Sequence, residues 1–415
     1  MNEKKPKGLT VSAKEHGKTS RIVEFLNEEY DIAIDAISNN RMYITAKKRK
    51  YDFQIKFDDI ILHMWDENIT VSDSVLRKIL LSPNYIKTVN PVEKYFADLE
   101  GKYKGKSHID ILCSHLKARD YGDQKKKNYY QDRLCYLVRK WLVALVAQVK
   151  GVRMNDVALG FVHQEEGVGK TFLTQFLCPP DLNFYYDSVN SDNNKMTLED
   201  IFSRNLIVNF DELVGINKKN PEDFKQIMSM QEVTVKVPHD PFPKKVKRLA
   251  SATFTSNLTP EMGGFIHPNM GYRRFATIEL IDIDKKYSEV VDINQVYAEA
   301  VMLLKQDFPF SWECDYESFK EANQRYLIES TALKYVKLFI RQPQNGEGKF
   351  MTAQQIWEKL YKDKKIKSDD DKKVDQRTIG VALSNLGFER THKYFPELQN
   401  NRYGYNVTFM YDLTN

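Results

Sequence analysis

The chain has 415 residues, too many for a single hydrophobic core, so we expect two or three domains. Its 42% hydrophobic and 29% charged residues are ordinary for a globular protein, and a net charge of +5 does not by itself predict a nucleic-acid partner. The absence of a CxxC pair, of a signal-peptide pattern and of an apolar run of membrane-spanning length argues against a zinc site, a secreted disulfide framework and a membrane partner. We therefore predict a cytoplasmic protein.

The first 150 residues predict a small α+β domain followed by helices. Residues 1–19 are polar, Lys-rich and aperiodic, which indicates a flexible basic arm. A helical stretch, 21–30, precedes two segments with the alternation of strands, MYITAKK (42–48) and YDFQIKF (51–57). Helical patterns follow at 58–65, 72–81 and 90–99. We assign 20–89 to an N-terminal α+β domain and 90–150 to a helical collar or linker.

The middle of the chain, 151–310, alternates short apolar strands with helices. The expected strands are VALGFVH (157–163), LIVNF (206–210), SATFTSN (251–257) and FATIEL (275–280). Because buried runs that alternate with helices are typical of parallel sheets covered on both faces, we predict an α/β domain with a largely parallel sheet.

A phosphate-binding loop is predicted directly after the first of these strands, in the sequence QEEGVGKT (164–171). Such a loop needs inward-pointing backbone amides, a lysine for the β- and γ-phosphates and a hydroxyl for Mg²⁺. The residues that supply these groups, and thereby predict ATP and Mg²⁺ as cofactors, are Gly167, Val168, Gly169, Lys170, Thr171 and Phe172. Gln164 stands where the strict pattern has a glycine.

Polar residues at the ends of the later strands complete the candidate site. Asp211 follows a buried strand and would lie beside the metal with Thr171, whereas Glu212 would deprotonate the attacking water. Asn257 ends the next strand and is expected to hold that water or the γ-phosphate. The pair Arg273 and Arg274 precedes the last strand, as expected of a finger that acts on the site of a neighbouring subunit.

The ordered motifs GVGKT, LIVNFDEL, SATFTSN and GYRRF resemble those of the virulence-associated protein E family of phage, plasmid and mobile-island ATPases. These are relatives of the superfamily 3 replicative helicases in the AAA+ class, and the resemblance covers about residues 90–308. It implies ATP hydrolysis at the interfaces of a homo-hexameric ring, with Arg274 preferred over Arg273 as the finger. Tyr272 replaces the Asn usual in the family motif, which leaves the choice between the two arginines open.

In superfamily 3 helicases a β-hairpin between the acidic strand and the sensor strand carries basic side chains into the pore. Here that interval is VTVKVPHDPFPKKVKRLA (233–250). By this resemblance the candidates for contacts to single-stranded DNA are Lys236, His239, Lys244, Lys245, Lys247 and Arg248. The alternative is a charged surface hairpin without a nucleic-acid role.

The last 86 residues, 330–415, predict a winged-helix domain. Three helical patterns, 332–340, 352–361 and 375–388, are followed by two strand-like segments, 388–395 and 403–411. The third helix would present Gln376 and Arg377 to the groove of duplex DNA. The alternative is that this unit docks another protein.

These predictions favour an ATP-dependent DNA helicase or replication initiator of a phage, plasmid or other mobile element, with a separate primase as a partner that the resemblance allows. A second hypothesis is an ATP-dependent regulatory switch that binds DNA without translocating. A third, weaker one is a P-loop kinase of small substrates, against which the acidic pair and the arginine pair argue because they favour hydrolysis.

Overall fold

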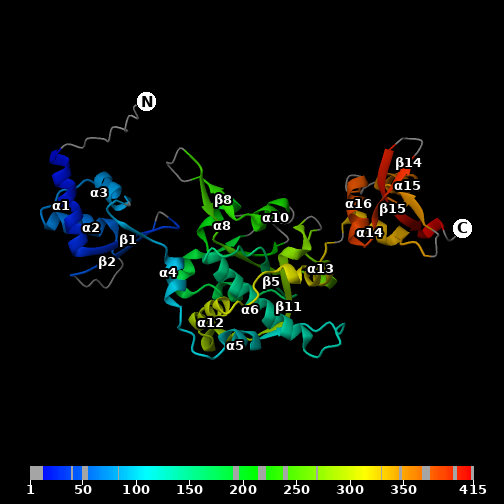
Figure 1. Cartoon of the computed structure of the whole chain (residues 1–415), viewed down its shortest axis with the longest axis horizontal. Helices are drawn as coiled ribbons and strands as arrows, with labels where there is room; N and C mark the ends of the chain where they lie inside the picture. The colour runs from blue at the N-terminus through cyan, green and yellow to red at the C-terminus, as the bar shows by residue number, and fades with distance from the viewer. Residues whose placement is uncertain are drawn as a thin grey trace.

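The structure is a computed structural model that describes residues 13–38, 41–48, 55–82, 84–189, 196–213, 221–236, 242–267, 270–328, 330–344, 348–366, 374–395 and 400–412. The fold is mixed α/β, with sheets of three, six, four and two strands. Figure 1 shows the six-stranded sheet and its helices at the centre of the view, with the N-terminal elements to one side and the C-terminal elements to the other.

The N-terminal elements are α1 (Ala13–Glu29), β1 (Tyr30–Asp35), β2 (Met42–Ala46), α2 (Phe57–Asp66), α3 (Asp73–Leu80) and β3 (Lys87–Val89). Strand β1 lies between antiparallel β2 and parallel β3, over a hydrophobic cluster of its own. Two predictions need correction. Residues 13–19 belong to α1 rather than to an arm, because Ala, Lys and Glu favour helix although the buried face begins only at Ile22. Of the strand expected at 51–57, residues 51–54 lie outside the described residues. Residues 55 and 56 have no regular structure, and Phe57 begins α2.

The region expected to be a collar packs directly on the central sheet. Its elements are α4 (Pro91–Asp98), α5 (His108–Ser114), the short strand β4 (Leu116–Ala118) and the long helix α6 (Tyr129–Val149). The apolar run at 141–149 lies within α6, which shares one hydrophobic cluster with α12 (Ile293–Lys305) and the sheet. Within the described ranges, no helix combines the length and apolarity that crossing a bilayer requires.

The six-stranded sheet has the order β4-β11-β5-β10-β7-β6. Its strands are β5 (Ala158–Val162), β6 (Tyr186–Val189), β7 (Ile207–Phe210), β10 (Ser251–Ser256) and β11 (Phe275–Ile283), all parallel, with β4 antiparallel at one edge. The prediction of a largely parallel sheet is confirmed, although β4 and β6 were not expected. The carboxyl ends of the parallel strands meet at one edge, which is where ligands bind in open sheets of this kind.

Both faces of the sheet are covered, as the apolar strands required. On β5, Leu159 and Phe161 face the cluster formed with α6 and α12, whereas Ala158 and Val162 face a second cluster. That second cluster includes side chains of α8 (Leu198–Arg204) and α10 (Pro221–Ser229), and Figure 1 shows these two helices on the opposite side of the sheet from α6 and α12. Packing is tight, because a Cβ added at Gly160 would lie 1.8 Å from the ring of Phe254.

The C-terminal elements form a separate hydrophobic cluster. They are α14 (Thr331–Phe339), β12 (Ile340–Arg341), β13 (Lys349–Met351), α15 (Ala353–Lys362), α16 (Gln376–Asn385), β14 (Arg390–Phe395) and β15 (Asn400–Phe409). Strand β15 pairs with the other three, all antiparallel. The three predicted helices and the terminal strand pair are therefore present, with two further short strands.

Candidate active site

The loop after β5 returns on itself through two glycines with left-handed backbones. Gly167 has φ +72° and Gly169 has φ +109°, conformations that side-chain-bearing residues rarely adopt. Helix α7 (Lys170–Phe176) begins immediately after Gly169. The loop thus closes over the carboxyl end of β5, where the sequence predicts it.

Lys170 is held inside this loop. Its side chain is buried, and Nζ donates to the carbonyl oxygens of His163 (3.1 Å) and Glu165 (2.8 Å). Burial lowers the pKa of Lys170, while the nearby carboxylates of Asp211, Glu166 and Glu212 oppose that shift. Among the residues that the structure describes, the hydrogen-bond partners of this ammonium are two neutral carbonyl groups, and negative charges lie nearby.

Asp211, which follows β7, connects the phosphate-binding loop to strand β10. Its Oδ1 accepts from Thr171 Oγ1 at 3.1 Å and from Thr255 Oγ1 at 2.6 Å. Strand β5, which leads into the loop, and strand β7, which precedes Asp211, are not adjacent, because β10 lies between them and contributes Thr255 from its carboxyl end. Thr171 and Asp211 present hard oxygen ligands side by side, and this donor set fits Mg²⁺.

Glu212 and Asn257 lie on the outer side of the same edge. Asn257 Nδ2 is 3.5 Å from Glu212 Oε1, and the Glu212 side chain is exposed. Glu212 has φ +49°, a left-handed conformation that costs a β-carbon-bearing residue about 1–2 kcal/mol. The turn directs the two successive carboxylates to different partners, Asp211 to the threonines and Glu212 to the amide.

A cavity of about 580 Å³ unites these groups. It is lined by Glu166, Gly167, Gly169, Lys170, Thr171, Phe172, Asp211, Glu212, Thr255, Asn257 and Lys285. Val168, predicted with the loop, packs against the hydrophobic core instead. Sequence reasoning missed Glu166, Thr255 and Lys285. Thr255 could have been found by its place near the carboxyl end of the strand that precedes Asn257, whereas Lys285 belongs to no motif.

The arginine pair lies at the other edge of the sheet. Arg273 and Arg274 form a 3-10 turn, η4 (Tyr272–Arg274), before β11, and β11 begins where β5 begins. Arg274 is buried and donates to Ser229 Oγ at 2.8 Å, and burial lowers its pKa. Arg273 is exposed, with its guanidinium 5.2 Å from the ring centroid of Tyr316. Of the two arginines that the sequence offers as a finger, the preferred Arg274 is buried and Arg273 is exposed.

A β-hairpin between the acidic strand and the sensor strand is confirmed as β8 (Glu232–Val235) and β9 (Lys244–Lys247), which pair antiparallel. The lysines predicted to contact DNA are exposed on it: Lys236, Lys244, Lys245 and Lys247. His239 lies outside the described residues.

Arg248 does not belong to this exposed set, and its prediction is wrong. The side chain is buried, and its guanidinium donates to the carbonyl oxygens of Ile227 (3.1 Å) and Asn155 (2.6 Å) and to Gln148 Oε1 (3.0 Å). Burial lowers its pKa to about 10. Arg248 anchors the base of the hairpin to the core.

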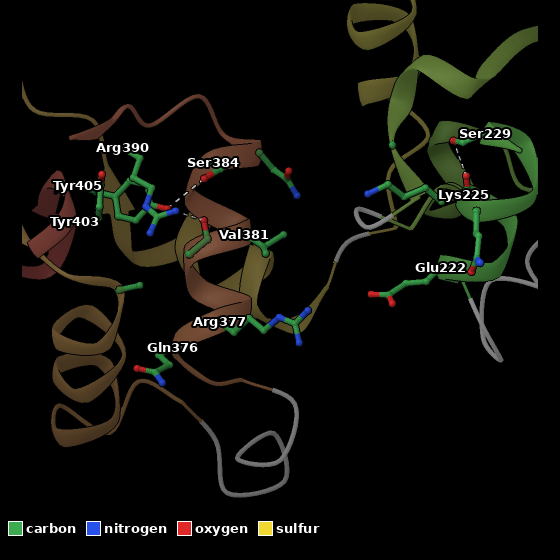
Figure 2. Close-up of a pocket in the computed structure, with 15 residues that line it drawn as sticks. Glu222, Lys225, Ser229, Gln376, Arg377, Val381, Ser384, Arg390, Tyr403 and Tyr405 are labelled. Atoms are coloured by element: carbon green, nitrogen blue, oxygen red, sulfur yellow. Dashed lines mark hydrogen bonds between the residues drawn. The ribbon is translucent and has the colours of Figure 1, made fainter. Parts of the chain in front are cut away.

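Gln376 and Arg377 are exposed at the start of α16, far along the chain from the candidate active site. They line a separate cavity of about 970 Å³ between α16 and α10. Figure 2 shows Arg377 extending from α16 toward the wall that carries Glu222 and Lys225. A hydrogen bond from Tyr272 to Asn385 Oδ1 (3.0 Å) joins the arginine-bearing turn to the end of α16.

Comparison with known proteins identifies the family. The profile of the virulence-associated protein E-like domain matches residues 99–331, more than half of the chain, and the chain therefore belongs to this family. The predicted resemblance to the virulence-associated protein E family is confirmed. Among curated proteins the search finds no match.

Three solved structures that resemble the chain have low sequence identity to it. The apo structure of the NrS-1 C terminal region (305-718) covers 94% of this chain and 99% of its own, with 12% identity and a TM-score of 0.47. Two A form apo structures of the same region cover 94% of this chain and 98% of theirs, at 12% identity, with TM-scores of 0.45 and 0.44.

Proposed function

We propose that this chain is an ATPase of the AAA+ class that hydrolyses ATP at the carboxyl edge of its parallel sheet. The observation that carries the proposal is the convergence of Lys170, Thr171, Asp211, Glu212 and Asn257, from three strands, on one cavity. Membership in the virulence-associated protein E-like family supports it.

Each side chain has a chemical task in this reaction. The Lys170 ammonium, held by neutral carbonyl groups only, exchanges them for phosphate oxygens. Thr171 and Asp211 hold Mg²⁺, which when bound neutralises charge on the phosphates. Glu212 accepts the proton of the attacking water. The side-chain amide of Asn257, 3.5 Å from the Glu212 carboxylate, orients that carboxylate and the water.

The proposal extends to a ring. Arg273 is exposed but lies at the sheet edge opposite its own cavity, so it serves a neighbouring subunit and a single chain holds half of a complete site. We propose a homo-hexamer whose exposed hairpin lysines, Lys244 and Lys245 among them, follow a single strand of DNA through the pore.

The remaining assignments stay part of the same proposal. Residues 330–415 are a winged-helix domain that binds duplex DNA through Gln376 and Arg377, and residues 20–89 are an interaction domain. Residues 90–310 form the ATPase domain, because α6 and β4 belong to the core of the central sheet. The chain is a helicase or replication initiator of a mobile element, a role that allows a separate primase as a partner.

Three measurements test the proposal. Calorimetry with Mg²⁺ and a slowly hydrolysed ATP analogue should show binding by the natural chain and none by Lys170→Met. Hydrolysis per chain should rise with protein concentration and with added single-stranded DNA, and a forked substrate should be unwound. Absence of nucleotide binding would remove the ATPase proposal, whereas hydrolysis without unwinding would favour the regulatory switch.

A further inference from the structure

Lys285 lies over the phosphate-binding loop although it is far from it in the chain. It follows β11, which lies beside β5 up to Glu279 opposite Val162 and continues to Ile283 past the end of β5. Its Nζ is 3.5 Å from the carbonyl oxygen of Gly167, and a Cβ added at Gly169 would lie 3.0 Å from its Cε. The lysine therefore borders the cavity from the side opposite the acids of β7.

The backbone that carries Lys285 is fixed on both sides. Asp284 is bound by the ring of His115 (Nδ1 to Oδ2, 2.8 Å), and its backbone amide donates to the His115 carbonyl oxygen. Tyr287 is fully buried and packs edge-on against Phe176 of α7, with ring centroids 4.9 Å apart. Lys285 is thus an exposed side chain on a rigid segment that is attached to the helix of the loop itself.

The cavity has more acidic than basic side chains, and Lys285 offsets part of this negative charge. The ionisable groups that line it are the carboxylates of Glu166, Asp211 and Glu212 and the ammonium groups of Lys170 and Lys285. Without Lys285 a single cation would face three anions in a cavity that has to accept a polyanion. Lys285 removes part of that repulsion beside the turn of the loop backbone at Gly167.

We propose that Lys285 is a second phosphate-binding cation, which acts in the same subunit as the loop and contacts the phosphates shared by ADP and ATP. The inference rests on the proposed ATPase function. The contact to Gly167 assigns Lys285 to the inner phosphates rather than to the terminal one. This glycine belongs to the backbone that encloses the inner phosphates of a bound nucleotide. Lys285 consequently adds affinity for both nucleotides rather than discriminating between them.

The test compares Lys285→Ala with Lys286→Ala in the full-length chain. Lys286 is the matched control because it is adjacent and exposed but does not line the cavity. Calorimetry with Mg²⁺ and either ADP or ATPγS should show a Kd about tenfold higher for Lys285→Ala, which corresponds to about 1.4 kcal/mol, and no change for Lys286→Ala. Lys285→Arg should recover most of the affinity, and all variants should melt at the same Tm.

The outcomes separate this inference from the proposed function. If the natural chain binds neither nucleotide, the ATPase proposal itself fails. If the natural chain binds, Lys170→Met does not, and Lys285→Ala binds both nucleotides as tightly as the control, the role of Lys285 alone is refuted. A loss confined to ATPγS would also overturn the inference as stated, because it would assign Lys285 to the terminal phosphate.

Discussion

Replacing Arg273 by alanine should stop ATP turnover without disturbing the chain that carries the change. Strand β11 runs parallel to β5 in register from Phe275 opposite Ala158 to Glu279 opposite Val162. Five residues at about 3.3 Å each separate the start of these strands from the edge with the cavity by roughly 16 Å. Arg273, which precedes β11, therefore cannot complete the cavity of its own subunit.

The size of the effect follows from this geometry. Loss of an arginine finger costs roughly 10³–10⁵ in turnover. Because Arg273 is exposed, its loss should change the free energy of unfolding by no more than about 0.5 kcal/mol. Arg274→Ala should behave in the opposite way: removing a buried guanidinium bonded to Ser229 should destabilise the chain by about 1–3 kcal/mol. Thermal melts and ATP binding of both variants are the controls.

Mixing two inactive variants provides the decisive assay. Arg273→Ala subunits keep an intact cavity, and Lys170→Met subunits keep an intact Arg273. In an equimolar ring half of the cavities are intact and half of their neighbours supply an arginine, so about a quarter of the interfaces should be complete. ATP hydrolysis should reappear on mixing. Full activity of Arg273→Ala alone, or no recovery in a mixture that has exchanged subunits, would refute the reasoning.

Four further predictions concern nucleotide binding, stability and DNA binding. Lys170→Met should abolish nucleotide binding in calorimetry without lowering the Tm, because it removes a buried cation that has no anionic hydrogen-bond partner. Gly160→Ala should lower the free energy of urea unfolding by about 1–3 kcal/mol, because the added methyl group meets Phe254; an unchanged midpoint would contradict the packing. Arg248→Met should destabilise the chain by roughly 2–4 kcal/mol in the same assay, whereas Lys245→Ala should leave stability unchanged and lower the salt slope of single-stranded DNA binding by about 0.7 in anisotropy titrations. Equal stability of these last two variants would place Arg248 back on the surface.

Most parts of the site that the sequence predicts lie on consecutive residues, and Asn257 is the exception. Gly167 to Thr171 are consecutive, and Asp211 and Glu212 directly follow one strand, so local order suffices to recognise them. Thr255 and Lys285 reach the cavity only because β10 lies between β5 and β7 and β11 lies on the other side of β5. Strand order is a property of the whole sheet, and no local pattern encodes it.

Short or mixed segments account for the fold elements that were missed. Strand β4 has three residues and β6 has four, too few for an alternation to be recognised. Arg248 shows a different limit: in sequence it continues a run of exposed lysines, and its burial depends on acceptors from Gln148, Asn155 and Ile227. Charge alone predicts exposure, and only the tertiary contacts reverse that expectation.

The left-handed backbone at Glu212 has a consequence for anyone who redesigns this chain. A search for stabilising substitutions would select this position early, since glycine or asparagine tolerates φ +49° better than glutamate does. Such a replacement would trade a carboxylate next to Asn257 for a relaxed turn. Stability of the fold and the proposed catalysis place opposite demands on position 212. A sequence optimised for stability alone would therefore lose the carboxylate.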